Sequence, residues 1–361
     1  MKKNTILLIN EGLSDNFGDQ AIKESMSFLI KKTGFNVIFQ DLTRNKNKYR
    51  HQYDIEIGEN KRTFLTPLKS MIWKMLWVAK NLKRIAVTSM CKYDAVVIGG
   101  GQLLLSNGIF PLALLLWVAL LKFRNNKNIV LFSVGMQGEY VGIQRWAFSY
   151  ILKNIEHVYV RDALSKEILE KVFSRKSELT YDSAFIYDSI YKIRQTKEVY
   201  KYLIGIVDYE IYCQYDVKIN NTKLSRYDYF KTWAAYANKG DDLDKAALIY
   251  ATAEDRRECI KFKDYIKAHY NTDIDILENT TQKEFLKNLE LGETIVSGRM
   301  HSLILSLVLR KKILPYIISE KIQAFLRVIE KNFDIQKAQQ TLFYDFDCLM
   351  SKTLPINSKN R

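Results

Sequence analysis

The sequence has few of the residues that mark a disulfide-stabilised or metal-binding protein. Its four cysteines, at positions 91, 213, 259 and 348 of a 361-residue chain, form no Cys-x-x-Cys pair. Their wide separation indicates neither a disulfide framework nor a zinc site. Because no group of His, Asp and Glu has ligand spacing either, we expect no metal. Reduced cysteines are typical of a cytoplasmic protein, and this is the location that we expect.

Long apolar runs are also absent. The longest one, residues 109–121, is shorter than the ~20 residues that span a bilayer, and Pro111 lies near its beginning. We therefore expect a buried helix there and no membrane span. The apolar stretch at residues 6–9 is too short for a secretory signal and leads at once into a polar loop, so we expect it to belong to the fold.

Acidic residues are outnumbered by basic ones, which gives the chain a net charge of +15. Such a charge indicates anionic partners: nucleic acid, an anionic membrane surface or a phosphorylated substrate. The basic cluster at residues 44–50 resembles a nucleic-acid patch, but a solvated loop explains it more simply. We expect no nucleic-acid partner.

Residues 63–87 carry apolar and basic side chains at helical spacing. Basic amphipathic helices with aromatic residues lie on anionic lipid, but the same pattern fits a helix that packs on its own domain with a solvated basic face. Both interpretations stay open. In the first, the protein is peripheral at the inner face of the plasma membrane. The anchoring residues would then be Trp73, Trp77, Lys69, Lys74, Lys80, Lys83 and Arg84.

Short apolar runs alternate with helical patterns along most of the chain. The pattern predicts strands at residues 4–10, 36–40, 93–98, 129–134, 157–160, 202–207, 246–252, 274–277, 295–297 and 313–318, and a last strand end at 180–185. This alternation is typical of parallel sheets covered on both faces. Because a single core seldom exceeds ~250–300 residues, we predict an α/β protein with two Rossmann-like domains facing across a cleft. We place the domains at residues 1–190 and 191–335, and a C-terminal segment with a disordered tail at 336–361.

Polar residues and glycines follow several predicted strands, and ligands bind at the carboxyl ends of strands in such sheets. The glycines Gly18, Gly100, Gly101 and Gly135 lie at these ends, and we expect them to form turns rather than to contact a ligand. Asp19 is placed to cap the helix that follows it. For Arg161, an orientation toward the cleft and a local pair with Asp162 are equally compatible with the spacing.

The segment 295–304 joins a predicted strand to a helix and contains Arg299 and His301. A helix N-terminus favours an anion. Arginine adds a fork of donors suited to a carboxylate or phosphate, and histidine is the residue best suited to transfer a proton near neutral pH. The alternative is that Arg299 pairs with a structural acid and His301 only packs.

Four segments taken together resemble the polysaccharide pyruvyl transferase family. They are residues 15–22, 94–101, 160–165 and 297–304, which read DNFGDQAI, DAVVIGGG, VRDALS and SGRMHSLI. The resemblance covers most of the chain, from residue 6 to about residue 325. It implies a GT-B-like fold and transfer of a pyruvate ketal from phosphoenolpyruvate to a sugar of a cell-surface polysaccharide or its lipid-linked precursor. Phosphoenolpyruvate is then a co-substrate, and no cofactor is expected.

The resemblance also implies roles for individual residues. Arg161 and Arg299 would bind the donor with the backbone of Met300, and Lys321 would assist them. His301 would be the general acid. Asn16 or Asp19, near the end of the first strand, would orient the saccharide acceptor. The acceptor side also includes the cleft glycines Gly18, Gly100, Gly101 and Gly135.

Two other classes of protein share part of this pattern. A GT-B nucleotide-sugar glycosyltransferase would also place phosphates at a basic strand-to-helix junction, but Arg161 would then have less reason to reach the donor. A non-enzymatic module for a membrane surface or nucleic acid would depend on the basic segments alone, with a steep salt dependence.

Overall fold

The structure is a computed structural model of the chain, and it describes residues 4–44, 66–192, 197–213, 224–237, 242–329 and 333–354. Three features of the sequence analysis lie outside these residues: most of the basic cluster at 44–50, the first residues of the amphipathic segment at 63–87, and the tail from residue 355.

The first domain contains a six-stranded sheet in which all paired strands are parallel, in the order β2-β1-β3-β4-β5-β6. Its strands are β1 (Thr5–Asn10), β2 (Asn36–Asp41), β3 (Ala95–Leu105), β4 (Ile129–Gln137), β5 (Val158–Val160) and β6 (Glu178–Leu179). Ile6 and Leu8 of β1 belong to one core cluster, whereas Leu7 and Ile9 belong to another. The sheet is therefore buried on both faces, as the continuous apolar strands predict.

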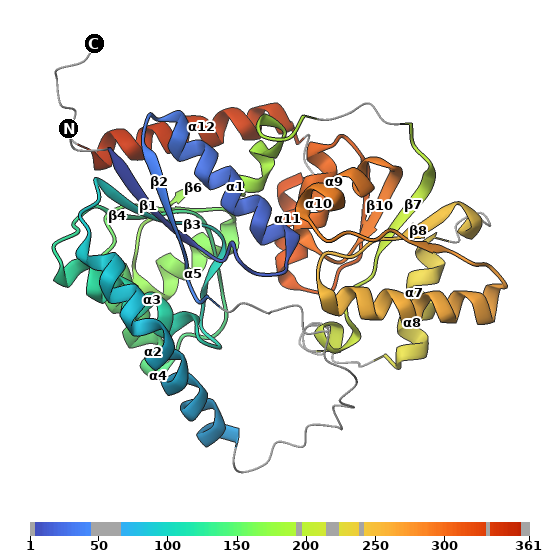
Figure 1. Cartoon of the computed structure of the whole chain (residues 1–361), viewed down its shortest axis with the longest axis horizontal. Coiled ribbons are helices and arrows are strands. Elements are labelled where there is room, and N and C mark those ends of the chain that lie inside the picture. The colour runs from blue at the N-terminus through green and yellow to red at the C-terminus, as the bar shows by residue number, and fades with distance from the viewer. Residues whose placement is uncertain are drawn as a thin grey trace.

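Helices cover both faces of this sheet (Figure 1). They are α1 (Phe17–Lys32), α2 (Thr66–Met90), α3 (Phe110–Phe123), α4 (Gly142–Lys153), α5 (Ala163–Phe173) and the 3₁₀ helix η1 (Ser183–Ser189). The expected buried helix at residues 109–121 corresponds to α3, in which Trp117 and Val118 are fully buried.

The second domain contains a five-stranded parallel sheet in the order β11-β10-β7-β8-β9. Its strands are β7 (Tyr200–Gly205), β8 (Ala246–Leu248), β9 (Asp275–Ile276), β10 (Gly292–Ser297) and β11 (Lys312–Pro315). Its helices are α7 (Arg226–Ala237), η2 (Leu243–Lys245), α8 (Ala253–Tyr270), α9 (Gln282–Glu290), α10 (Met300–Val308) and α11 (Glu320–Ile329). Two parallel sheets of this kind confirm the prediction of two Rossmann-like domains.

The last helix, α12 (Ile335–Thr353), crosses back to the first domain (Figure 1). Phe346 packs edge-on against Phe132 of β4, with ring centroids 5.0 Å apart. Asp334 caps the start of the helix by accepting from the backbone N–H of Gln336 at 2.8 Å. Most of the segment that the sequence analysis set apart at residues 336–361 is thus a helix packed on the first domain.

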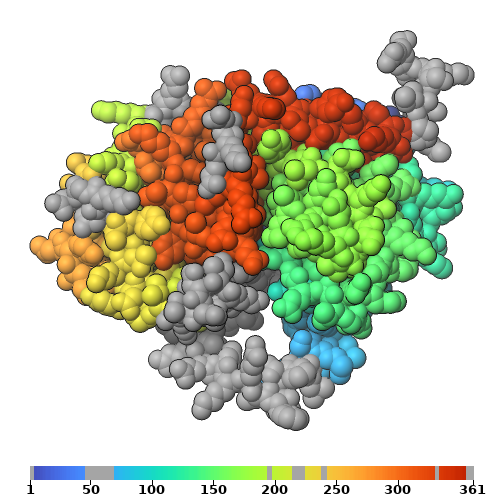
Figure 2. Space-filling model, turned by 180° about the vertical axis from the view of Figure 1, so that it is seen from behind, coloured from blue at the N-terminus to red at the C-terminus, as the bar shows by residue number. Residues whose placement is uncertain are grey.

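The two domains touch through apolar contacts as well as through their connections. Phe17 of α1 stacks on Phe285 of α9 at 5.4 Å, and the N–H of Phe17 donates to the carbonyl of Ala251 at 3.2 Å. One core cluster includes residues of both domains. In Figure 2 the residues around α10 and α11, in orange, lie directly against the green residues that precede β7.

Two local expectations are wrong. β3 does not end at the triple glycine but continues through it, with Gly100 and Gly101 at positive φ and a register shift against β4 beyond Gly101. Residues 180–185 are not a strand end, because β6 stops at Leu179 and η1 begins at Ser183. There the carboxylate of Asp182 accepts from the N–H of Ala184, which favours a helical turn over an extended strand.

Candidate functional site

Both sheets have a topological switch point, and part of the candidate site follows the strands at these points. In the first sheet the chain leaves β1 toward β2 on one side and toward β3 on the other. In the second sheet the corresponding pair is β7 and β10. The carboxyl ends of strands at a switch point are where open α/β sheets bind ligands. Asn10 ends β1, and Arg299 and His301 follow β10.

The turn after β10 places His301 in the first turn of α10. The hydroxyl oxygen of Ser297 accepts from the N–H of Arg299 at 3.0 Å, and α10 begins at Met300. The first N–H groups of a helix have no intrahelical partner, so they point their partial positive charge at whatever lies before the helix. His301 is buried there, together with Met300 and Ser302.

Asp182 joins the two domains at the centre of the site. Its Oδ2 lies 2.7 Å from Nη1 of Arg161 and 3.4 Å from Nε2 of His301, and its Oδ1 accepts from the N–H of Ala184 at 3.0 Å. In the described part of the chain, Nε2 of His301 makes no hydrogen bond of normal geometry. No local sequence pattern marks Asp182, because its partners are Arg161 and His301, which are distant in the sequence.

This arrangement shifts three pKa values. Burial lowers the pKa of His301 below its ordinary value, although the carboxylate of Asp182 opposes the shift. Burial alone would raise the pKa of Asp182, but the positive charges of His301 and Arg161 outweigh it and hold that pKa below its ordinary value. Burial, with the positive charge of Arg161 nearby, lowers the pKa of Lys321 to about 8. Lys321 thus stays mostly protonated at neutral pH.

Arg161 points to the site, and Asp162 has a separate role. Nε of Arg161 lies 3.6 Å from Asp162 Oδ2, which is longer than its contact with Asp182. Asp162 mainly caps α5, because its Oδ1 accepts from the N–H of Ser165 at 2.7 Å. The hydroxyl of Ser165 in turn accepts from the N–H of Met136 in β4 at 2.7 Å. Of the two alternatives for Arg161, the cleft orientation dominates.

Arg299 is held by an acid of its own domain. Its Nε and Nη2 donate to Oδ2 and Oδ1 of Asp255 at 2.9 and 2.7 Å, which is a bidentate pair. Asp255 is buried in the first turn of α8, where its N–H donates to the cap residue Thr252. The pairing with a structural acid, one of the two alternatives for Arg299, is therefore present. The Arg299 side chain keeps 21% of its surface exposed.

Two glycines leave room for the central side chains. A Cβ at Gly18 would lie 2.4 Å from Cβ of His301, and a Cβ at Gly135 would lie 2.8 Å from Nε of Arg161. The prediction of turns at these two positions is wrong, because Gly18 lies in α1 and Gly135 lies within β4. Their role is to let the imidazole and the guanidinium pack directly against backbone.

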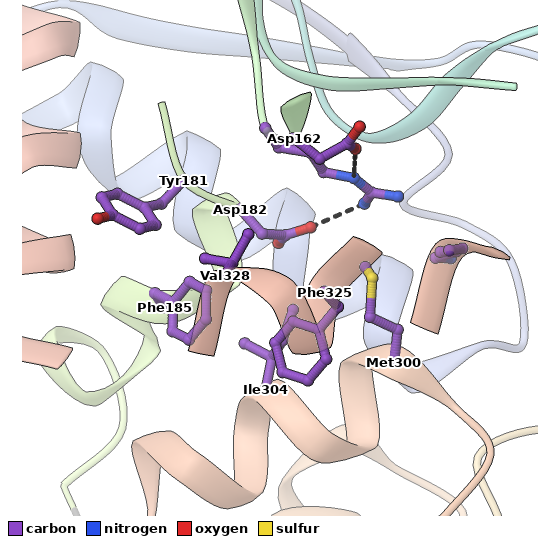
Figure 3. Close-up of a pocket in the computed structure, with 10 residues that line it drawn as sticks. Asp162, Tyr181, Asp182, Phe185, Met300, Ile304, Phe325 and Val328 are labelled. Atoms are coloured by element: carbon purple, nitrogen blue, oxygen red, sulfur yellow. Dashed lines mark hydrogen bonds and ion pairs between the residues drawn. The ribbon is translucent and has the colours of Figure 1, made fainter. Parts of the chain in front are cut away.

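Two cavities adjoin this cluster. The first, which we call the Arg161 cavity, is shown in Figure 3 and lies between the domains. It is lined by Arg161, Asp162, Tyr181, Asp182, Phe185, Met300, Ile304, Lys321, Phe325 and Val328. Lys321 has no hydrogen bond or ion pair within the described residues, so its ammonium group is available to a ligand.

The second cavity, which we call the Asn10 cavity, lies at the switch point of the first sheet and contains about 580 Å³ of empty space, including solvent at its mouth. It is lined by Asn10, Glu11, Asn16, Asp19, Ile22, Gly100, Gly101, Gln102, Leu103, Leu105, Phe110, His301 and Lys321. His301 and Lys321, which belong to the second domain, therefore reach a cavity that is otherwise lined by residues of the first domain. Arg299 lines neither cavity.

The loop before α1 contributes Asn16 and Asp19 to the Asn10 cavity. Asn16, not Asp19, caps α1, since its side chain accepts from the N–H of Gly18 at 2.9 Å. Asp19 instead accepts from the hydroxyl of Ser14 at 2.9 Å. The expected capping role of Asp19 is wrong, because the helix begins two residues earlier, at Phe17.

Glu11, which the sequence analysis did not single out, follows Asn10 in the same cavity. Its two carboxyl oxygens accept from the N–H and the hydroxyl of Thr43 at 2.8 and 2.9 Å. Burial and the nearby carboxylate of Asp41 raise the pKa of Glu11 to about 8. Only the position of Glu11 after a buried strand could have pointed to it.

The described residues contain no group of three or more His, Cys, Asp or Glu side chains arranged to hold a metal ion. Among the described helices, none is both long enough and apolar enough to cross a bilayer.

The structure defines a two-domain α/β protein with a largely buried, cationic cluster at the boundary between its Rossmann-like domains. Residues 16–318 match the family model described as polysaccharide pyruvyl transferase. Because this match covers most of the chain, the protein belongs to the polysaccharide pyruvyl transferase family. A comparison with curated proteins gave no match.

Several solved structures are similar over nearly the whole chain at low identity. A UDP-N-acetylglucosamine 2-epimerase from Rickettsia bellii is 12% identical with a TM-score of 0.48, and 98% of each chain is covered. A UDP-GlcNAc 2-epimerase from Methanocaldococcus jannaschii is 12% identical with a TM-score of 0.47, covering 94% of this chain and 91% of the other. A glycosyltransferase from Rickettsia africae is 11% identical with a TM-score of 0.43, covering 99% and 96%. The two parallel sheets themselves establish the GT-B-like α/β fold.

Proposed function

We propose that this protein transfers the enolpyruvyl-derived group of phosphoenolpyruvate to a sugar of a cell-surface polysaccharide or its precursor, forming a pyruvate ketal and releasing phosphate. The observation that carries the proposal is the contact of His301 with Asp182 beside Arg161 and Lys321, which combines a proton donor with two cations in a buried site.

The donor is expected to bind by its carboxylate and phosphate. Arg161 supplies a guanidinium fork, and Lys321 supplies an ammonium group with no other partner in the described residues. The N-terminus of α10 at Met300 adds backbone N–H groups and a partial positive charge. Arg299 uses Nε and Nη2 for its pair with Asp255, so only its remaining N–H groups are available to the donor, and we assign Arg299 the outer donor position.

The reaction follows from the polarity of the enol phosphate group of phosphoenolpyruvate. The His301 imidazolium transfers its proton to the methylene carbon, which becomes the methyl group and leaves a cationic centre at the adjacent carbon. A hydroxyl of the acceptor attacks this carbon. The bond from the same carbon to the phosphate oxygen then breaks, a second hydroxyl of the same sugar closes the ketal, and phosphate leaves. Of the two hydroxyl protons, one returns to His301 and the other leaves with phosphate or solvent.

Thermal unfolding with candidate donors tests this proposal against a nucleotide-sugar glycosyltransferase. A ligand that binds only the folded state at a hundred times its dissociation constant stabilises it by ~2.7 kcal/mol. We expect phosphoenolpyruvate to raise the melting temperature and UDP to leave it unchanged at equal concentration. A rise with UDP alone would contradict the proposal, and a rise with an oligonucleotide alone would favour the nucleic-acid module.

We propose further that α2 holds the enzyme against an anionic membrane surface, where a lipid-linked acceptor would be found. The first half of α2 extends away from the body of the first domain (Figure 1). It exposes the apolar side chains Met71, Ile72, Trp73, Met75 and Leu76. Exposed lysines Lys69, Lys80 and Lys83 lie on the same helix.

Two residues expected to be anchors hold α2 on its own domain instead. Trp77 is buried, and its Nε1 donates to the carbonyl of Thr43 at 2.7 Å. Nη1 of Arg84 donates to the carbonyl of Asp41 at 2.6 Å, and its guanidinium lies over the ring of Trp117. The helix thus packs on the first domain from Trp77 onward and leaves the turns around Trp73 exposed.

Charge reversal on α2 is expected to abolish vesicle binding. Each basic side chain near an anionic leaflet contributes about 1 kcal/mol, so the combined variant Lys69→Glu, Lys80→Glu, Lys83→Glu should not co-sediment with phosphatidylglycerol vesicles that carry the wild-type protein down. High salt should have the same effect. The matched control reverses Lys231, Lys267 and Lys283, which are exposed on the second domain. Wild-type protein that stays in the supernatant at low salt would refute membrane association.

A further inference from the structure

The side-chain amide of Asn10 is buried without a partner. Asn10 ends β1 and is 1% exposed, and neither Nδ2 nor Oδ1 has a hydrogen bond within the described part of the chain. Leaving such a group unpaired costs about 1–3 kcal/mol. In folded proteins the large majority of buried polar side-chain atoms have a hydrogen-bond partner. An unpaired amide that lines a cavity therefore indicates a ligand that pairs with it.

The position of the amide supports this inference. The Asn10 cavity lies at the carboxyl ends of β1 and β3, which form the switch point of the first sheet. Gly100 and Gly101 at its wall have positive φ and carry no side chain into it.

The chemistry of the wall selects a neutral polyol. An amide offers donors and acceptors together, which matches hydroxyl groups, whereas a phosphate or carboxylate group can only accept. The carboxylate of Asp19 and the ammonium group of Lys321 both line the cavity, and because their opposite charges offset each other, the wall favours neither an anion nor a cation. Both oxygens of Glu11 accept hydrogen bonds from Thr43, whereas the amide of Asn10 has no partner within the described residues and can pair with hydroxyl groups of a ligand.

We propose that the Asn10 cavity is the acceptor subsite, in which the Asn10 amide hydrogen-bonds hydroxyls of a neutral hexose unit. His301 and Lys321 line the same cavity, so a hydroxyl bound there lies in the same space as the imidazole that acts on the donor. The role of the bound sugar as a pyruvyl acceptor depends on the proposed function, but the binding of the sugar does not.

Asn10→Leu tests the assignment with two readouts. We expect the wild-type protein to bind at least one of four probes: the methyl β-glycosides of glucose, galactose, mannose and N-acetylmannosamine, followed by saturation-transfer NMR. Asn10→Leu should weaken this binding at least tenfold. The variant should also raise the melting temperature of the ligand-free protein, because it removes a buried unpaired amide, and stabilisation with loss of binding is typical of a functional site.

Ser89→Ala is the matched control. Its hydroxyl is fully buried and unpaired like the Asn10 amide, but it lines neither cavity. This variant should leave glycoside affinity unchanged. Asn10→Asp retains the shape of the side chain if Asn10→Leu fails to fold, and it should also weaken binding.

The outcomes separate the subsite from the reaction. Unchanged glycoside affinity in folded Asn10 variants would overturn the subsite, as would a wild-type protein that binds none of the probes at millimolar concentration. Phosphoenolpyruvate should stabilise Asn10→Leu as much as wild type. Failure of phosphoenolpyruvate to stabilise either protein, with glycoside binding still dependent on Asn10, would leave the subsite standing and refute the proposed function.

Discussion

His301→Gln is expected to lower kcat by about 10²–10⁴-fold, the usual contribution of a positioned general acid. Its affinity for phosphoenolpyruvate should change little, because Arg161 and Lys321 remain. Release of phosphate from phosphoenolpyruvate in the presence of acceptor measures the first quantity, and calorimetric titration measures the second. His269→Gln is the matched control, since His269 is bonded to the carbonyl of Tyr265 in the second domain and lines neither cavity.

The pH profile gives the same hypothesis a second readout. His301 must be protonated to act, so kcat/KM should fall as the pH rises through the pKa of His301 in the free enzyme. Burial lowers that pKa below its ordinary value, and Asp182 opposes the shift. Asp182→Asn should therefore move the fall in activity to lower pH. The role of His301 would be contradicted if His301→Gln kept the kcat of the wild-type protein. It would also be contradicted if Asp182→Asn left the pH dependence of kcat/KM unchanged.

The sequence was sufficient for the fold and for the residues that carry charge. Apolar strands alternating with helical patterns predicted both sheets, and the motifs around Arg161 and His301 marked the ends of β5 and β10. Such features are local, since the residues that determine a strand, a turn or the start of a helix are neighbours in the sequence.

The partners of these residues could not be predicted in this way. Asp182 lies 21 residues after Arg161, and Asp255 lies 44 residues before Arg299. Each is an ordinary helix-capping or first-turn acid in its own segment. Only the packing of the two domains makes Asp182 the shared partner of Arg161 and His301. In the same way, Gly18 reads as a turn glycine, whereas its function is set by the side chain of His301 from the other domain.

Asn10 shows the same limit in another form. An asparagine after four apolar residues is a common way to end a strand, and nothing in its neighbours distinguishes it. Its unpaired amide becomes visible only when burial and hydrogen bonds are counted in three dimensions. A buried polar group without a hydrogen bond departs from the usual structure of proteins, and such departures are expected at functional sites. Sequence patterns do not reveal them.

Arg161→Ala is expected to weaken the binding of phosphoenolpyruvate by about 10–100-fold, since a charge-assisted hydrogen bond contributes ~1.5–3 kcal/mol and 1.4 kcal/mol corresponds to tenfold. The variant should also lose stability, because Asp182 is left buried with one cation fewer. Removing one partner of a buried ion pair costs about 3–5 kcal/mol. Calorimetric titration and denaturant unfolding at the same pH measure the two effects.

The double variant Arg161→Ala, Asp182→Asn separates these two effects. It removes the orphaned negative charge, so most of the lost stability should return while the affinity for phosphoenolpyruvate stays low. Arg175→Ala is the control for loss of an arginine from the same domain, because among the described residues Nη2 of Arg175 donates to the carbonyls of Ile155 and Glu156 alone, at 2.7 and 2.8 Å. Phosphoenolpyruvate binding that survives intact in the double variant would mean that the first domain does not hold the donor, and a nucleotide-sugar glycosyltransferase would then be the better hypothesis.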